Sequence, residues 1–212
     1  MVLVALAAIA AFGFGQTGSN DLRAVWTAAQ EVALGNPQLV YPSPGPLFTM
    51  RPPDEWLAHL RAAGHQGDIY PYIYPPLWAW LLAPVTENIS FDAIVLFMRF
   101  LNGAALVGGL FIARHLCLPG ATDHQRLTFF SVGFAGLLLT HSGVVALYEN
   151  QPQILVGFLT LLGIERSENG HPAFGGAALA LAAALKGYPA LLAVFWIQPG
   201  NGWRWHLSCS SV

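Results

Sequence analysis

The hydrophobic residues of this 212-residue chain fall into runs that polar segments separate. An apolar opening at residues 1–15 precedes a polar and aromatic stretch at 16–74, and further apolar runs follow at about 75–86, 91–116, 127–147, 152–164 and 173–197. A membrane-spanning helix needs about 20 apolar residues. The pattern therefore predicts an all-α, multi-pass transmembrane helix bundle. Residues 1–15 lack the basic start of a secretory signal and are interpreted as the first span.

Two short helices are predicted within the stretch 16–74. The first covers residues 21–35, with Ser19 or Asn20 as its cap and Gly35 at its end. The second covers residues 52–64, where a proline pair and two acids precede apolar positions at helical spacing. Both helices are amphipathic, so we expect them to lie at the membrane interface.

Basic residues and histidines gather in two of the later loops. The first loop carries Arg114, His115, His124 and Arg126, and the second carries Arg166 and His171. The positive-inside rule places both loops in the cytoplasm. The stretch 16–74 then forms a long external first loop, which puts Asp21, the aromatic segment 70–76 and the polar turn 148–153 on the same outer side.

The run at 152–164 is too short to cross a bilayer, because it reaches only about 20 Å against a hydrocarbon core of about 30 Å. Its polar start contains Asn150, Gln151 and Gln153. Two readings are open: these residues line a buried cavity, or the helix starts earlier and leaves them at the interface.

The composition excludes several classes of protein. Hydrophobic residues make up 55% of the chain and charged residues 9%, far below the roughly one quarter that is usual in soluble domains. One lysine and eight scattered arginines give no basic face for nucleic acid. Cys117 and Cys209 have no partner at metal-ligand spacing and the histidines form no ligand motif, so no metal site is expected.

Lys186 is the single lysine and lies about 21 Å of helix beyond Pro172, inside the run 173–197. A charge at that depth costs about 2.5–3.5 kcal/mol on insertion scales and is usually functional. Pro189 interrupts the helix just after it, as in ion and phosphate sites of membrane proteins. The alternative is that Lys186 extends its stem to reach the outer interface.

Asp21 and the tyrosines of segment 70–76 each have two readings. Asp21 opens the first external helix, so it either only complements the helix dipole or acts as a general base toward an acceptor hydroxyl. Tyr70, Tyr72 and Tyr74 either belong to an aromatic belt at the water–lipid boundary or stack on a sugar.

Three segments, in this order, resemble glycosyltransferase family 87, the polyprenyl-phosphate-mannose-dependent mannosyltransferases of the C-type membrane superfamily. They are DLRAVWTAAQEVALGNPQLVY at 21–41, YIYPPLWAWLLAP at 72–84 and, most specifically, the segment 150–193 from NQPQ to the Gly/Ala-rich helix with Lys186 and Pro189. The family's usual Gly-Gln is Asn150-Gln151 here, and Gln153 stands where Asn is expected. The resemblance covers only the first half of a typical member, so we interpret 1–212 as a single integral membrane domain that is a fragment, with an irregular tail at 198–212.

The resemblance implies an inverting transfer of a hexose, with mannose favoured, from a polyprenyl-phosphate donor to a hydroxyl of an external glycan or glycolipid. Asp21 would deprotonate the acceptor, and Lys186 with Arg23 would bind the donor phosphate. Tyr74, Gln151 and Gln153 would bind substrate. The lipid-linked sugar is itself a substrate, so no cofactor is needed, and the site would face the outside of a bacterial plasma membrane.

Two other classes explain parts of the pattern. A transporter or channel would also use a deep lysine and a helix interrupted by proline, but it predicts inverted repeats, and residues 1–100 do not repeat in 101–197. An inactive remnant of a truncated enzyme would explain the irregular C-terminal tail.

Overall fold

The computed structural model describes residues 19–41, 51–62 and 64–196, and every regular element within them is helical. The α-helices are α2 (Asn20–Ala33), α3 (Asp54–Ala62), α4 (Leu77–Leu82), α5 (Phe91–Cys117), α6 (Asp123–Leu139), α7 (His141–Tyr148), α8 (Gln153–Glu168) and α9 (Pro172–Leu185). The 3₁₀ helices are η1 (Pro37–Leu39), η2 (Ala83–Val85) and η3 (Tyr188–Trp196). The predicted all-α class is confirmed, whereas the predicted first span 1–15 and tail 198–212 lie outside the described residues.

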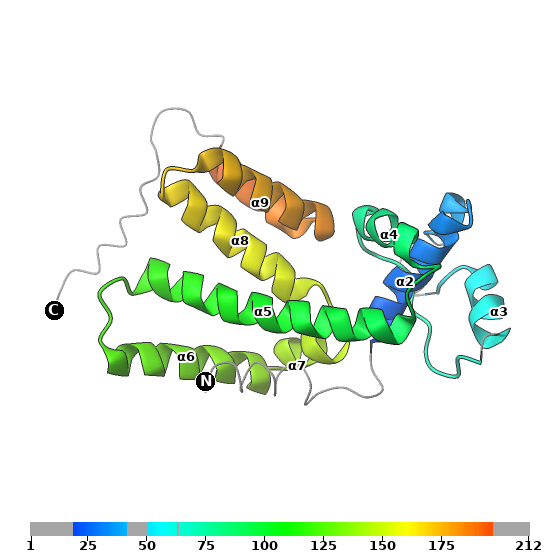
Figure 1. Ribbon diagram of the computed structural model, residues 1–212, viewed down its shortest axis with the longest axis horizontal. Helices are drawn as coiled ribbons and strands as arrows, with labels where there is room; N and C mark the ends of the chain where they lie inside the picture. The colour runs from blue at the N-terminus through cyan, green and yellow to red at the C-terminus, as the bar shows by residue number, and fades with distance from the viewer. Residues whose placement is uncertain (1–18, 42–50, 63, 197–212) are drawn as a thin grey trace.

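The long helix α5 runs through the middle of the molecule (Figure 1). The α8–α9 hairpin lies on one side of it, and α6 with α7 lies on the other. Helices α2, α3 and α4 gather at the N-terminal end of α5, and the α5–α6 and α8–α9 loops lie at the opposite end. The two loops with the basic residues therefore share one end, and α2, which carries Asp21 in its first turn, lies at the other.

One described helix, α5, is long and apolar enough to cross a bilayer, and α6 with α7 would make a second if this bent pair counts as one span. At 27 residues α5 extends about 40 Å. The runs at 75–86 and 173–197 form shorter helices because each is interrupted: the first becomes α4 and η2, and the second breaks at Lys186.

Glycines bring α8 and α9 close together. A Cβ added to Gly175 would lie 2.6 Å from the carbonyl oxygen of Gly163 and 2.2 Å from Ser167 Oγ. The Ser167 hydroxyl donates to the Gly163 carbonyl oxygen at 2.8 Å, so the serine side chain also lies at the interface between α8 and α9. Small residues and hydroxyls are what membrane helices use for close packing, because lipid gives no hydrophobic drive for their association.

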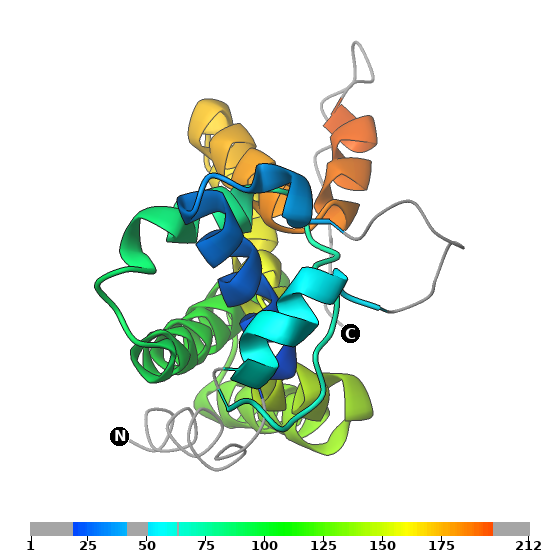
Figure 2. The ribbon, with the colours of Figure 1, turned by 90° about the vertical axis from the view of Figure 1, so that its right-hand side faces the viewer.

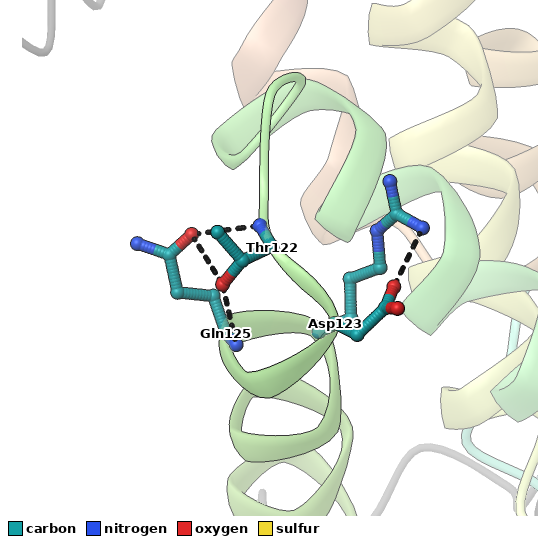
Figure 3. Close-up of polar contacts among 4 residues, drawn as sticks. Thr122, Asp123 and Gln125 are labelled. Atoms are coloured by element: carbon teal, nitrogen blue, oxygen red, sulfur yellow. Dashed lines mark hydrogen bonds and ion pairs between the residues drawn. The ribbon is translucent and has the colours of Figure 1, made fainter.

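A capping box starts α6 (Figure 3). The backbone N–H of Gln125 donates to Thr122 Oγ1 at 3.4 Å, and the backbone N–H of Thr122 donates to the side-chain Oε1 of Gln125 at 2.9 Å. Arg126 adds an exposed ion pair with Asp123 at 3.2 Å. These contacts satisfy backbone donors that the first turn leaves unpaired. They fix the point at which the chain turns back along α5.

The predicted run 127–147 is not straight, because the chain bends by 74° between α6 and α7. Thr140 is extended at the bend, and its Oγ1 accepts a hydrogen bond from the Gly143 amide at 3.2 Å, so it restarts the helix as the cap of α7. A Cβ on Gly143 would lie 1.9 Å from the Leu137 carbonyl oxygen. Glycine is therefore required there.

Helix α2 differs from the interfacial helix that its sequence predicts. Most of its residues are buried, on more than one face: Leu22, Ala24, Val25, Trp26, Thr27, Ala28, Ala29 and Glu31. α4, η1, η2 and the start of α5 pack against it, so its apolar face contacts protein and is not open to lipid. α3 keeps the predicted amphipathic pattern, with Trp56 and Leu60 buried. The difference gives Asp21 a rigid protein setting.

Candidate active site

The start of α2 is tied to the turn between α7 and α8 by a set of hydrogen bonds between residues 19–21 and 149–151. Asn150 Nδ2 donates to Ser19 Oγ at 2.7 Å, and both side chains are buried. Glu149 Oε2 accepts from the amide nitrogens of Asn20 at 2.6 Å and Asp21 at 3.3 Å. Gln151 Nε2 donates to Asp21 Oδ2. We call this set the α2 clasp; it joins segments about 130 residues apart.

Both halves of the α2 clasp have uncommon backbone geometry. Ser19 has φ = 79° and Asn150 has φ = 51°, and these are the two non-glycine residues with positive φ among those described. Serine rarely adopts that region, and such geometry costs about 1–3 kcal/mol unless the surroundings hold it. The hydrogen bond between the two side chains provides that support.

Glu149 supplies the cap of α2. The first turn of a helix has unpaired N–H groups and a partial positive charge, so a carboxylate there is favourable. Ser19, one of the two predicted caps, occupies the N-cap position but makes no side-chain capping bond. The residue that makes one, Glu149, was missed from the sequence. The sequence held only a weak signal for this cap. Glu149 is an acid next to Asn150, in a turn that was expected on the same outer side of the membrane as Asp21.

Asn102, near the middle of α5, forms a hydrogen bond with the backbone of the α2 clasp. Its Nδ2 donates to the Gln151 carbonyl oxygen at 3.3 Å, and the residue is buried. Among the described residues its Oδ1 has no hydrogen-bond partner. A buried acceptor without a partner is costly, so Asn102 lowers the stability of the region around this turn unless another group fills the position.

The side chains of Lys186 and Tyr74 lie close together. The lysine Nζ lies 5.6 Å from the centroid of the Tyr74 ring, within the range of a cation–π interaction. Burial raises the pKa of Tyr74, and the Asp21 charge raises it further. Tyr74 is therefore a neutral phenol and a possible hydrogen-bond donor. Burial lowers the pKa of Lys186 and the Asp21 charge opposes that effect. The Asp21 carboxylate therefore lies within electrostatic range of both residues, and the three side chains are treated together as one candidate group.

The local sequence explains how Lys186 is presented. α9 ends at Leu185, Lys186 is extended, and the chain resumes as the 3₁₀ helix η3 with buried Pro189 in its first turn. The interruption that Pro189 predicted is therefore present. A cation at a helix C-terminus is favoured by the helix dipole. The Lys186 side chain is partly buried, and its ammonium lies beside the Tyr74 ring.

Two of the expected site residues are not brought into this group. Gln153 Nε2 donates to the hydroxyl of Tyr188, an exposed residue, at 2.9 Å. Arg23 lies over the Phe91 ring, with its guanidinium carbon 3.9 Å from the ring centroid. Burial lowers the pKa of Arg23, and the charge of Asp92 partly opposes that effect. Positions 21 and 23 point about 200° apart on a helix, which explains why Arg23 does not accompany Asp21.

The buried turn residue Asn150 lines only a very small cavity, of about 10 Å³, with Pro152 and residues of α2, α4 and α5. That is room for about one water molecule. Of the two readings of this turn, burial is confirmed for Asn150, whereas Gln151 and Gln153 are only partly buried.

The family model of Glycosyltransferase family 87 matches residues 72–205, which is more than half of the chain. No curated protein and no solved structure matches. The chain belongs to Glycosyltransferase family 87, so it is an enzyme that transfers a sugar, and the resemblance seen in the sequence is confirmed. The family is membrane-associated, in keeping with helix α5. Tyr74, Gln151, Gln153 and Lys186 lie within the matched region, and Asp21 and Arg23 precede it.

Proposed function

We propose that the protein moves a hexose, mannose being favoured, from a polyprenyl phosphate to a hydroxyl of an external glycan or glycolipid. One observation carries this proposal: a lysine ammonium lies 5.6 Å from the ring of a tyrosine on another segment, and both are within electrostatic range of the Asp21 carboxylate on a third. Glycosyl transfer from a phosphate needs a base for the acceptor and a cation for the leaving group.

Asp21 is the proposed base. Gln151 donates a hydrogen bond to Oδ2, which orients the carboxylate and leaves Oδ1 for an acceptor hydroxyl. The hydroxyl oxygen bonds to the anomeric carbon while the bond from that carbon to the phosphate oxygen breaks. The proton passes to Asp21, and the polyprenyl phosphate leaves with the electron pair. Attack opposite the leaving group inverts the anomeric centre.

Lys186 is the proposed partner of the donor phosphate. Negative charge grows on the phosphate oxygen as the bond breaks, and a fixed cation stabilises that charge in the transition state. Tyr74 orients the lysine through its ring and can donate a hydrogen bond through its hydroxyl. Gln151 holds the Asp21 carboxylate and is proposed to position the base, whereas Gln153 contacts Tyr188 and is given no role in the transfer. Arg23 faces elsewhere, so the phosphate role is proposed for Lys186 alone.

The surface of the helices supports a multi-pass arrangement in the membrane. Large apolar side chains are exposed along α5 and α6: Leu96, Phe97, Phe100, Phe111, Leu127, Val132 and Leu139. A surface of this kind suits lipid better than water. With the basic α5–α6 and α8–α9 loops on the cytoplasmic side, the α2 clasp faces outward. We propose a bacterial plasma membrane with the site on its external face.

The direct test is an assay of the complete protein in membrane vesicles with polyprenyl-phosphate-mannose and, separately, a nucleotide-linked mannose. Transfer from the lipid donor alone, with inverted stereochemistry in the product, is expected. Transfer from the nucleotide sugar alone, or retention of configuration, would overturn the proposal.

A further inference from the structure

A second cavity, of about 290 Å³, lies on the other face of α2 from Asp21. It is enclosed by α2, α3 and the segment that leads into α5; α2 and α3 lie side by side in Figure 2. Arg23, Gln30 and Glu31 contribute polar groups from α2, and His59 adds one from α3. Trp26 and Phe91 supply apolar surface. None of these groups is used by the reaction proposed above.

The polar groups of this cavity retain unused hydrogen-bonding capacity. Among the described residues, no carboxylate lies at ion-pair distance from Arg23. The side-chain amide of Gln30 likewise has no hydrogen-bond partner within that part of the chain. Glu31 is 4% exposed and accepts one bond, from Asn36 Nδ2 at 3.2 Å. A carboxylate can accept about four hydrogen bonds and a guanidinium can donate five. The cavity thus offers both donors and acceptors.

These groups select a class of ligand. Arg23 and Glu31 carry opposite charges, so the pair brings no net charge to the cavity. A phosphate would meet the Glu31 carboxylate, and a lipid tail would leave buried charges without partners, which is costly. A saccharide ring satisfies both requirements, since its hydroxyls donate and accept while its C–H faces lie on aromatic rings. The volume is at the lower end of small-molecule sites, about 300–1,000 Å³, and suits a sugar unit.

We propose that this cavity binds an uncharged sugar unit of the acceptor glycan, distant from the reacting hydroxyl, and so sets acceptor specificity. The proposal rests on the proposed function. Arg23 follows Asp21 by two residues, or about 3 Å along the helix axis, and the helix is about 10 Å across. An acceptor of several sugar units is long enough to span this distance, with its hydroxyl at Asp21 and more distant sugars in the cavity. Gln30 and Glu31 determine the sugar that fits.

The test measures binding apart from catalysis. The complete protein in detergent micelles is titrated with neutral trisaccharides of mannose, glucose and galactose, and with a phosphorylated trisaccharide. Gln30→Ala and Glu31→Gln are compared with Gln38→Ala, a matched change at an exposed position outside the cavity. At least one neutral trisaccharide should bind, about fivefold or more weakly in each cavity variant and unchanged in the control. Melting temperatures confirm that both variants are folded.

Kinetics separate this proposal from the proposed function. Gln30→Ala should raise the KM for the acceptor and leave the KM for the donor unchanged. Binding that depends on Gln30 without any transfer from the lipid donor would leave the sugar site standing and refute the donor chemistry. Transfer with wild-type acceptor KM in both variants, tighter binding of the phosphorylated sugar, or no binding of any neutral trisaccharide would refute the sugar site.

Discussion

Glu149 Oε2 accepts a hydrogen bond from the backbone amide of Asn20 at 2.6 Å, across 129 residues of sequence. The same oxygen accepts from the Asp21 amide at 3.3 Å. The Glu149 carboxylate, in the turn between α7 and α8, therefore caps α2, the helix that carries the proposed base Asp21. The base is oriented by the fold as a whole, and the cap should control both the stability and the activity of the enzyme.

Glu149→Ala should lower stability and transfer together. Loss of a helix cap costs about 0.5–2 kcal/mol, and the freed first turn would let Asp21 move away from Gln151. Thermal melting in micelles and kcat at saturating donor would measure the two effects. Glu168→Ala, an exposed acid in the last turn of α8, is the matched control and should change neither. Normal kcat in Glu149→Ala would show that the cap does not position the base.

Asp21→Asn should reduce kcat by about 10²–10⁴, the usual contribution of a general base, with unchanged folding. Asparagine has nearly the same shape, so the hydrogen-bonded turn can persist while the base is lost. Asp123→Asn changes an exposed carboxylate at the start of α6 and serves as the control. Undiminished transfer by Asp21→Asn at equal protein level would remove Asp21 from the mechanism.

Lys186→Met should lower kcat because it keeps the length of the side chain and removes the charge that stabilises the departing phosphate. Lys186→Arg keeps the charge over the Tyr74 ring and should recover part of the rate. Assays with donors that carry better and poorer leaving groups distinguish the role: the defect of Lys186→Met should shrink as the leaving group improves. An equal defect for all donors would assign Lys186 to structure.

Much of the fold was predictable because it depends on local sequence. The C-terminal end of α2, the interruption at Lys186 and the start of α6 follow from glycines, prolines and caps close in sequence. The resemblance that names Asp21 and Lys186 rests on motif order. The bend at Thr140 had a local signal as well, a threonine three residues before a glycine, but the apolar run concealed it.

The contacts that build the site were not predictable. Ser19 meets Asn150 across 131 residues, and only the packing of α8 against α5 makes that pairing possible. The divergence of Arg23 from Asp21 follows from the helix period, but the face of α2 that α4 covers is not revealed by one sequence. A helix expected on the membrane surface proved to be mostly buried, because its small residues allow other helices to approach both of its faces.

Tyr74→Phe and Tyr74→Ala separate the hydroxyl of this residue from its ring. Phenylalanine keeps the aromatic face beneath Lys186, so only the hydroxyl's contribution should be lost and the melting temperature should stay close to wild type. Alanine leaves a cavity at a residue that is 5% exposed and should destabilise the protein by about 3–5 kcal/mol. Donor KM and thermal melting measure both. A larger stability loss in Tyr74→Phe than in Tyr74→Ala would contradict this assignment.

Gly143→Ala and Gly136→Ala form a matched pair on either side of the α6–α7 bend. A Cβ at position 143 would meet the Leu137 carbonyl at 1.9 Å, whereas one at 136 has no atom of the described structure within 4 Å. Gly136→Ala should therefore stabilise α6 by up to about 1 kcal/mol, because alanine favours helix over glycine. Gly143→Ala should force the bend open, lower the melting temperature, and reduce transfer, since α7 leads directly into Glu149. Equal melting temperatures for the two variants would show that the bend is not held as described.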